Sequence, residues 1–372
     1  MKIITLVGTR PEIIRLSETI KLLDLHFDHT FIHSGQNMAV NMRDVFFQDL
    51  DLRLPDIQWT VDQSSLAKTI GSTMERLENY ILESKPDALL TLGDTNTAIA
   101  GLIAKRMGVI TYHLEAGNRS FDENVPEETN RRSIDHFSDF NLAYSDRAYE
   151  NLMREGLSPR RTIKCGSPMR EVINANLSKV NSSTALSKLG LNEREYFLVS
   201  LHRQENVNSP RRLASAINSI NSLAHEYKKP VLFSVHPRTR DKIWRSGIEI
   251  SKAVTLHEPL GYIDFLKLQL NSFCVLSDSG TVSEESAILG FPAITIRDSM
   301  ERPEALDTGS IMMVGLDFDS IQRGIKLATS SDNILVSPSD YESTNHSQVV
   351  VKFIHSTLGR ANEWLGIRNL DS

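Results

Sequence analysis

A strand–helix–strand pattern near the middle of the first half most constrains what this chain can fold into. Ala88–Leu92 and Val109–Tyr112 are apolar runs typical of buried strands, and residues 98–107 between them have helical spacing. Asp94 and Glu115 fall where the two predicted strands run out. In an open parallel sheet the carboxyl ends of the strands border the ligand crevice. We therefore expect these two acids to mark a functional site.

The same alternation of strands and helices continues along the chain. Further apolar, strand-like runs occur at residues 2–7, 30–33, 141–144, 197–201, 231–235, 274–276 and 291–296. Such alternation is typical of α/β proteins whose parallel sheets are wound by helices on both faces. Because 372 residues are too many for one ordinary core, we expect two Rossmann-like, doubly wound domains. They should face each other across a cleft, the usual place for a polar ligand.

A break in this pattern indicates the domain boundary. The run Ile163–Pro168 interrupts the alternation, so we place an N-terminal domain at 1–168 and a C-terminal domain at 169–347. The last predicted helix, 348–358, carries an apolar stripe typical of core or interdomain packing. Residues 42–60 show no clear helical or strand period.

Composition and charge argue against several classes of function. A net charge of -6 leaves no excess of Lys and Arg for general nucleic-acid binding. No uncharged run is long enough to span a bilayer, and charges among the first twenty residues argue against a signal peptide. Cys165 and Cys274 are far apart, and no Cys/His cluster has metal-ligand spacing. We expect a cytoplasmic protein with reduced thiols, no structural metal, and neither nucleic acid nor membrane as a partner.

The candidate acids also have purely structural explanations. Aspartate before a helix is a good N-cap, and most residues placed like Asp94 do only that. Glu115 lies in a predicted central strand, where acids are rarely buried without partners. It shares a face with His113, so a structural ion-paired cluster is the alternative to function. Glu127 and Glu128 open a predicted helix, whose macrodipole favours acids in its first turn.

Two glycine turns at predicted helix N-termini are candidate anion sites. Arg10 follows the first strand and its glycine turn, although a solvated arginine in an ordinary turn fits equally well. In the second half, Ser279–Thr281 opens a helix with free N–H groups for a phosphate. Glu284 or Glu285 would then accept from a ribose hydroxyl; the alternative is a capped helix with two ordinary first-turn acids.

Two histidines follow predicted strands of the second half. His202 and His236 should lie at the same edge of one sheet. Each has the alternative of a hydrogen-bonded core histidine, but two at one edge favour a site.

Seven short motifs follow one another along the chain. They are Gly8-Thr9-Arg10-Pro11-Glu12, Gly93-Asp94-Thr95-Asn96, His113-Leu114-Glu115-Ala116-Gly117, Pro126-Glu127-Glu128-Thr129-Asn130-Arg131, His202-Arg203-Gln204-Glu205-Asn206, Asp278-Ser279-Gly280-Thr281 and Glu301-Arg302-Pro303-Glu304. In this order they resemble the non-hydrolysing UDP-N-acetylglucosamine 2-epimerases over nearly the whole chain. Asn118, Ser120-Phe121-Asp122 and Val125 are similar to a subgroup of capsule and O-antigen enzymes, which serve lipopolysaccharide and capsule biosynthesis. Members of that subgroup epimerise 6-deoxy-L sugars and yield UDP-N-acetyl-L-fucosamine.

The resemblance implies a fold and a reaction. It implies two Rossmann-like domains in the GT-B arrangement, with the C-terminal segment, about 348–372, packing back on the first domain. It also implies a homodimer that uses no metal and no nicotinamide cofactor. Family chemistry eliminates UDP between C1 and C2 of a UDP-2-acetamido sugar, leaves a glycal, and adds UDP back with the proton on the other face.

Site residues carry over by position. The matching candidates are, for catalysis, Asp94, Glu115, Glu127 and His202, and for substrate binding Arg10, Arg15, Arg203, His236, Phe265, Ser279, Gly280, Thr281, Glu285 and Arg302. Arg10 and His202 match groups at the diphosphate and reaction centre, and Phe265 matches a residue near the uracil.

Three departures from the family pattern bear on the substrate. Arg15 stands where many members have lysine, so a compact ammonium group is replaced by a planar guanidinium with several N–H donors. Thr281 replaces the second glycine of a Ser-Gly-Gly turn, and Leu260 falls where some members have glutamine. The expected substrate is UDP-2-acetamido-2,6-dideoxy-L-talose, with UDP-N-acetyl-L-fucosamine as product. The alternative pair is UDP-N-acetylglucosamine and UDP-N-acetylmannosamine.

Other classes of function remain open on the sequence. A GT-B glycosyltransferase shares the architecture, but retaining members often carry two glutamates eight residues apart, and neither Glu284 nor Glu285 has such a partner. A hydrolysing epimerase and a non-catalytic UDP-sugar sensor are further alternatives. The intact set of acids counts against the sensor.

Overall fold

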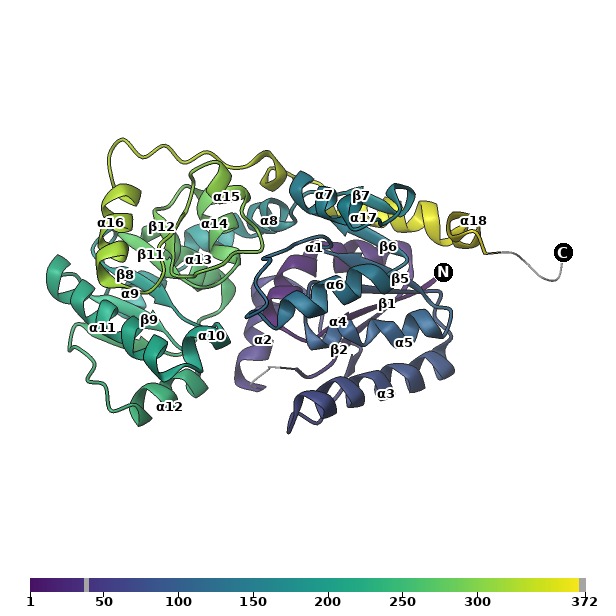
Figure 1. Ribbon diagram of the computed structural model, residues 1–372, viewed down its shortest axis with the longest axis horizontal. Helices are drawn as coiled ribbons and strands as arrows, with labels where there is room; N and C mark the ends of the chain where they lie inside the picture. The colour runs from purple at the N-terminus through teal and green to yellow at the C-terminus, as the bar shows by residue number, and fades with distance from the viewer. Residues whose placement is uncertain (37–39, 368–372) are drawn as a thin grey trace. The chain divides into compact units, whose positions relative to one another are not determined.

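The computed structural model describes residues 1–36 and 40–367. The chain forms two compact units, of which the first comprises Met1–Asn174 with Glu342–Ser372 and the second Ala175–Tyr341. Each unit is built on one parallel β-sheet with helices between successive strands (Figure 1). The prediction of two parallel-sheet α/β domains is therefore confirmed.

Seven strands form the sheet of the first unit. In spatial order they are β3 (Ile57–Gln58), β2 (Asp28–His33), β1 (Lys2–Val7), β4 (Ala88–Leu92), β5 (Ile110–Leu114), β6 (Phe140–Ala143) and β7 (Thr162–Lys164). Every pairing is parallel, so the carboxyl ends of β1, β4 and β5 lie at one edge. The central strands are almost wholly buried, as strands covered on both faces must be.

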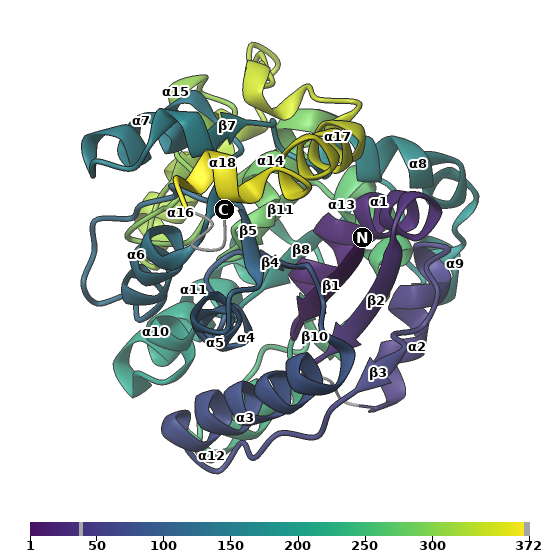
Figure 2. The same cartoon turned by 90° about the vertical axis from the view of Figure 1, so that its right-hand side faces the viewer.

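Helices cover both faces of this sheet. They are α1 (Arg10–His26), α2 (Val40–Asp49), α3 (Leu66–Ser84), α4 (Asn96–Ile99), α5 (Gly101–Arg106), α6 (Glu127–Phe137), α7 (Asp146–Arg154), the 3-10 turn η1 (Pro159–Arg161), α17 (His346–Leu358) and α18 (Ala361–Leu365). In Figure 2, α1 and α17 lie on one face and α3, α4 and α5 on the other. Helix α8 (Met169–Ser182) carries the chain from the first unit into the second.

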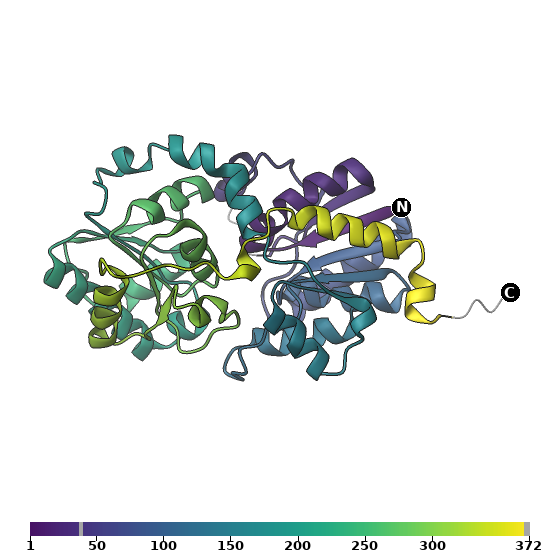
Figure 3. The same ribbon diagram turned by 90° about the horizontal axis from the view of Figure 1, so that it is seen from above.

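Helix α17, which follows the second unit in the chain, belongs to the first unit and packs beside α1 (Figure 3). The Tyr112 hydroxyl of β5 and the Thr357 hydroxyl of α17 are 2.7 Å apart. The Tyr112 ring stacks on Phe140 at 4.9 Å between centroids, and Phe353 meets Phe140 edge-on at 5.6 Å. Aromatic pairs of this geometry add to the area that the helix buries.

His346, the first residue of α17, is buried and its Nδ1 lies 2.9 Å from the Gly166 carbonyl oxygen. Burial lowers the pKa of His346 to about 4; the carbonyls of Gly166 and Cys165 oppose this shift, and the charge of Arg15 adds to it. A histidine held neutral in the folded state takes up protons on unfolding below its ordinary pKa of 6.5. Its contribution to stability is present above that pH and is lost as the pH falls toward 4.

We expect the first unit to lose roughly 2 kcal/mol of unfolding free energy between pH 7.5 and pH 5 through this residue alone. His346→Gln keeps a donor for the carbonyl and should remove that loss. His355→Gln, on the exposed side of the same helix, is the matched control and should keep the wild-type slope. Urea unfolding at the two pH values measures the difference, and equal slopes for wild type and His346→Gln would contradict the prediction.

The second unit repeats the architecture with six strands. In spatial order they are β10 (Val254–His257), β9 (Val231–Ser234), β8 (Phe197–Ser200), β11 (Cys274–Ser277), β12 (Ala293–Thr295) and β13 (Met312–Met313). The helices are α9 (Ala185–Leu189), α10 (Gln204–Val207), α11 (Pro210–Tyr227), α12 (Pro237–Arg245), α13 (Tyr262–Asn271), α14 (Thr281–Leu289), α15 (Glu304–Asp307), α16 (Phe318–Ala328) and the 3-10 turn η2 (Ser339–Tyr341). Its core joins apolar residues of these strands to those of α11 and α16.

Several details differ from the sequence prediction. The single helix expected at 98–107 is two short helices, α4 and α5, which meet at Ala100. Residues 40–49, which overlap the stretch 42–60 that shows no clear period, form α2. Cys165 and Cys274 are buried free thiols, and burial raises the pKa of each far above its ordinary value. Within the described residues, no helix is both long enough and apolar enough to cross a bilayer.

Candidate functional site

The carboxyl ends of the central strands in the first unit meet at Gly8, which follows β1. A Cβ atom on Gly8 would lie 2.1 Å from the Thr97 hydroxyl oxygen and 2.6 Å from the Ser34 hydroxyl oxygen. These two hydroxyl oxygens are themselves 2.8 Å apart. Only glycine therefore allows the turn after β1 to approach the segments that follow β2 and β4.

Glu12, in the first turn of α1, ties two strand-end turns together. Its Oε2 accepts from the N–H groups of Gly8 at 3.0 Å and Thr9 at 2.7 Å, and from the Thr9 hydroxyl at 2.8 Å. Its Oε1 accepts from the Thr95 hydroxyl at 3.1 Å. Burial raises the pKa of Glu12 to about 7, although these donors favour the charged form. In the sequence Glu12 is visible only as part of a motif, and the motif does not indicate this bridge.

Asp94 follows β4 and does not cap the next helix. Thr95 is the N-cap of α4, and its hydroxyl accepts from the Ala98 N–H at 3.2 Å. The Asp94 carboxylate instead accepts from Arg131 of α6, at 2.6 Å from Nη2 and 3.1 Å from Nε. Asn130 donates to the Asp94 carbonyl at 2.9 Å. The N-cap explanation of Asp94 is therefore wrong, and the residue is held by a long-range charge-assisted pair.

Glu115 is the first residue after β5, so it lies where the strand runs out, as expected. Its φ of +66° is unusual for a residue with a side chain and indicates a turn held by its surroundings. Only 7% of it is exposed, and its Oε2 lies 3.7 Å from Nε of Arg15, itself 1% exposed. Its Oε1 accepts from Asn118 at 3.4 Å. Glu115 is thus a buried carboxylate with a buried cation beside it.

The loop between these acids and α6 is fixed by Glu128, which is fully buried. Glu128 accepts from the N–H and hydroxyl of Ser120, at 3.0 and 2.9 Å, and from Arg131 at 2.6 Å. These donors and the Arg131 charge hold the pKa of Glu128 below its ordinary value, against the effect of burial. Glu127, the first residue of α6, is half-buried. Glu128 therefore has a structural role, and Glu127 remains the candidate catalytic acid of this helix.

Arg10 begins α1 beside the same turns. It is half-buried, its guanidinium lies 5.5 Å from the centre of the Phe46 ring, and burial lowers its pKa. It is therefore not the fully solvated arginine of the alternative explanation. Arg15 lies 5.9 Å from the Tyr144 ring centre in addition to its contact with Glu115.

In the second unit, Asp278 after β11 organises the strand-end turns. Its carboxylate is fully buried and accepts from the backbone N–H groups of His202 at 2.8 Å and Arg203 at 2.9 Å, and from Asn206 at 3.0 Å. These bonds fix the turn after β8 against the turn after β11. In the sequence Asp278 belongs to one of the seven motifs, which by itself does not indicate this role.

Gly280 comes just before α14, as the phosphate-site prediction requires. A Cβ on Gly280 would lie 2.9 Å from Glu301 Oε1, with guanidinium nitrogens of Arg302 and Arg203 at 3.6 and 3.8 Å. The Ser279 and Thr281 hydroxyl oxygens, on either side of it, are 3.1 Å apart. The helix N-terminus therefore sits beside two arginines, an arrangement that suits an anion.

Carboxylates hold both arginines in place. Arg203 donates to Glu301 at 2.8 Å, and Glu301 also accepts from the buried Arg297 at 2.6 Å. Arg302 donates to Glu284 at 2.9 Å. Glu284 thus has a buried structural partner. Glu285, whose buried partner Gln269 is a neutral amide, stays the candidate hydroxyl acceptor.

The other predicted site residues of this unit are Glu285, His202, His236 and Phe265, and they differ in burial and in hydrogen-bond partners. Glu285 is buried and accepts from Gln269 at 2.7 Å. His202 is exposed, so the core-histidine explanation is wrong for it. His236 is half-buried and caps α12, its ring accepting from the Arg238 N–H at 3.3 Å. Phe265 lies half-buried in the first turn of α13.

Comparison with known proteins identifies relatives that match most of the chain. A family model described as UDP-N-acetylglucosamine 2-epimerase matches residues 22–355. A UDP-N-acetylglucosamine 2-epimerase of Methanococcus maripaludis is 35% identical over 362 residues, covering 95% of this chain and 98% of that protein. A UDP-2,3-diacetamido-2,3-dideoxy-D-glucuronate 2-epimerase of Pseudomonas aeruginosa is 34% identical over 327 residues, covering 86% and 90%.

Solved structures give the same result. UDP-N-acetylglucosamine 2-epimerase from Rickettsia bellii superposes with a TM-score of 0.90 at 37% identity and covers 98% of both chains. The Methanocaldococcus jannaschii enzyme, in complex with UDP-GlcNAc and UDP, has a TM-score of 0.90 at 32% identity and covers 96% of this chain and all of the other. A family match over most of the chain, with relatives above 30% identity at nearly full length, leaves one assignment. The chain is an isomerase of the UDP-N-acetylglucosamine 2-epimerase family.

Proposed function

We propose that this protein is a non-hydrolysing 2-epimerase of a UDP-2-acetamido sugar. The observation that carries the proposal is the pair of carboxylates after adjacent strands. Asp94 follows β4 and Glu115 follows β5, and neither is used as a helix cap or left to solvent. General acid–base chemistry on a sugar carbon needs carboxylates fixed in this way.

The reaction itself requires elimination. No carbonyl stands next to C2 of a 2-acetamido sugar, so simple deprotonation would give an unstabilised carbanion. A carboxylate takes the C2 proton while the C1–O bond breaks and its electron pair leaves with UDP, which gives a glycal. In the reverse addition a proton reaches the other face of C2 and a UDP oxygen rebuilds the C1–O bond. Asp94, Glu115 and Glu127 are the candidates for these proton transfers.

A leaving diphosphate must also be bound firmly, because charge develops on it as the bond breaks. In the second unit, the N-terminus of α14 with Arg203 and Arg302 supplies N–H donors and positive charge for that purpose. In the first unit, Arg10 at the start of α1 is the candidate cation. His202 is proposed at the reaction centre, with Glu285 and Phe265 at the nucleoside.

For the sugar, we propose conversion of UDP-2-acetamido-2,6-dideoxy-L-talose to UDP-N-acetyl-L-fucosamine for a surface polysaccharide. The subgroup-like residue Asn118 supports this choice because it donates to the candidate catalytic Glu115. The alternative substrate is UDP-N-acetylglucosamine, as the names of several relatives favour. An apolar pocket separates a methyl from a hydroxymethyl only modestly, so the choice needs a direct test.

Proton NMR in deuterated water, with UDP-N-acetyl-L-fucosamine and UDP-N-acetylglucosamine in separate samples, tests both levels of the proposal. The expected result is a new anomeric signal with deuterium at C2 for the L-fucosamine sugar. Turnover of UDP-N-acetylglucosamine alone would overturn the sugar but keep the reaction. If UDP bound and neither sugar exchanged, the epimerase proposal would fail. Stoichiometric release of UDP would indicate hydrolysis, and transfer of labelled sugar to an acceptor would indicate a glycosyltransferase.

A further inference from the structure

His113 on β5 is fully buried between two hydrogen-bond acceptors. Its Nδ1 lies 2.8 Å from Oδ1 of Asp135 in α6. Its Nε2 lies 2.8 Å from the carbonyl oxygen of Gly93. A neutral imidazole has one N–H, and a backbone carbonyl can only accept. Nε2 must therefore carry a proton, and the bond to Asp135 needs a second one.

The second proton belongs on Nδ1 and not on the carboxylate. The other oxygen of Asp135, Oδ2, accepts from Nη1 of Arg119 at 2.7 Å and from the N–H of Gly117 at 3.1 Å. A guanidinium at that distance stabilises the ionised carboxylate. Arg119 also donates to Glu155 at 2.8 and 2.6 Å. With His113 charged, each buried charge of this cluster faces an opposite one, since His113 and Arg119 both contact Asp135 and Arg119 also contacts Glu155.

We propose that His113 is a doubly protonated imidazolium and that His113 and Asp135 form a positioning pair for the two candidate catalytic turns. The Gly93 carbonyl that His113 binds immediately precedes Asp94, and the Gly117 N–H that Asp135 binds comes two residues after Glu115. Gly93 and Glu115 have φ values of +71° and +66°. The hydrogen bonds of this pair to Gly93 and Gly117 hold both turns in place, and so they determine where Asp94 and Glu115 lie. Its catalytic consequence rests on the proposed function.

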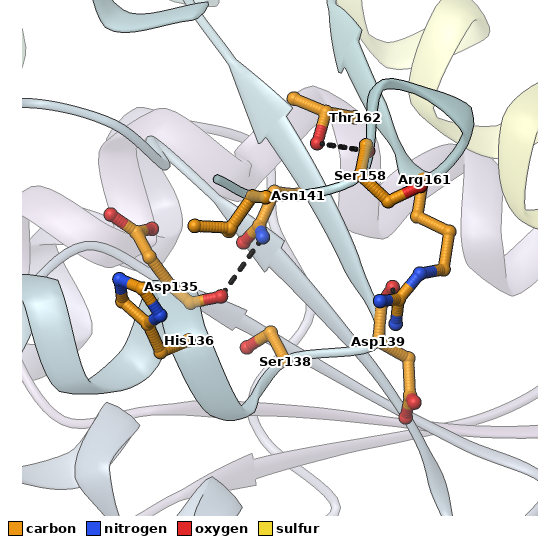
Figure 4. Close-up of a pocket in the computed structure, with 9 residues that line it drawn as sticks. Asp135, His136, Ser138, Asp139, Asn141, Ser158, Arg161 and Thr162 are labelled. Carbon is orange, nitrogen blue, oxygen red and sulfur yellow. Dashed lines mark hydrogen bonds between the residues drawn. The ribbon is translucent and has the colours of Figure 1, made fainter. Parts of the chain in front are cut away.

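Asp135 is itself fixed on its other side. Asn141 of β6 donates to the Asp135 carbonyl at 2.9 Å, as Figure 4 shows among the residues that line a small polar pocket. His136, which also lines this pocket, lies 3.2 Å from Glu155. The Asn141 bond fixes the backbone of Asp135, while the Gly117 N–H and Arg119 fix its carboxylate against His113.

The protonation state is tested on the wild-type protein without any substrate. Selective labelling with 15N-histidine and long-range proton–nitrogen NMR distinguishes an imidazolium, in which both ring nitrogens carry protons, from either neutral tautomer. The expected result is two protonated nitrogens for His113 at pH 7.5, assigned by loss of the signals in His113→Asn. One protonated and one unprotonated ring nitrogen would overturn the proposal. This readout does not depend on which reaction the enzyme catalyses.

The positioning role is tested with two matched buried aspartates. Asp139 lies at the opposite, amino-terminal end of β5, where it accepts from the Thr111 N–H and hydroxyl, each at 3.0 Å, and pairs with Lys105. Asp135→Asn should lower kcat about 100-fold, the size of effect that small misplacements produce. KM and UDP affinity should stay within about threefold, since this pair binds no nucleotide group.

Asp139→Asn should lower the unfolding midpoint by about as much as Asp135→Asn does. It should nevertheless leave kcat within about threefold of wild type. His113 should also lose its Nδ1 proton in Asp135→Asn, and only there. Equal kcat values for the two folded variants would overturn the positioning role. If the wild type turned over no UDP-sugar at all, the proposed function would fail, while the NMR result would still decide the charge of His113.

Discussion

Replacing Asp94 with Asn, or Glu115 with Gln, should lower kcat by roughly 10²- to 10⁴-fold, the usual contribution of a positioned acid or base. Both changes keep the shape of the side chain and remove its capacity to exchange a proton. The hydrogen bond from the Asn130 side chain to the backbone carbonyl of residue 94 does not involve the substituted side chain, so the turn should keep its position. UDP affinity should stay close to wild type, because most of the proposed UDP-binding residues lie in the second unit. NMR of quenched reactions or coupled assays measure kcat, and calorimetry measures UDP affinity.

Glu123→Gln is the matched control for these variants. Glu123 lies in the loop between β5 and α6, its side chain is 75% exposed, and its Oε1 lies 3.4 Å from Nη1 of the partly exposed Arg132. It should keep kcat within about twofold of wild type, as surface carboxylates generally do. Glu115→Gln also weakens the partner of the buried Arg15, so its folding must be checked by circular dichroism. Near-wild-type turnover in both Asp94→Asn and Glu115→Gln would refute their assigned roles.

Most of the fold could be predicted because it depends on local patterns. Apolar runs of four to six residues that alternate with segments of helical hydrophobic period are typical of buried parallel strands. The details that failed depend on contacts beyond the pattern. Gly101 stands directly after the break at Ala100, but a single glycine inside a helical period does not by itself predict that the helix ends. The helix at 40–49 has mixed residues whose period is weak.

The partners in the site could not be predicted, because they join residues far apart in sequence. Asp94 and Thr95 are both good N-caps, and only the arrival of Arg131 from α6 decides that Thr95 caps the helix. Likewise, the role of Glu128 as the anchor of a loop appears only when that loop folds back on α6. The sequence identifies which residues carry the chemistry, whereas the structure shows which neighbours hold them.

Gly117, in the turn just after Glu115, should be among the least replaceable residues of the first unit. Its φ is +84°, and a Cβ there would lie 2.1 Å from the Ala148 carbonyl oxygen and 2.9 Å from Leu152 Cγ. The first contact is with the backbone of α7, which cannot rotate away as a side chain can. Its own N–H and carbonyl are bonded to Asp135 and to Asn151. Any shift that relieves the clash therefore breaks buried hydrogen bonds.

We expect Gly117→Ala to destabilise the first unit by at least about 3 kcal/mol, the sum of an overpacking cost and a positive-φ cost. Gly156→Ala isolates the second cost, because Gly156 has a φ of +82° and nothing within 4 Å of the added methyl. That control should lose only about 1 kcal/mol. Urea unfolding followed by circular dichroism compares the two variants.

Equal losses for the two glycines would mean that the turn after β5 can move away from α7. That outcome would also weaken the positioning argument, since Glu115 is held by the same turn. A large loss confined to Gly117→Ala would show instead that the candidate catalytic carboxylate is attached to a rigid part of the unit. Rigidity of that kind is what a proton transfer between fixed groups requires.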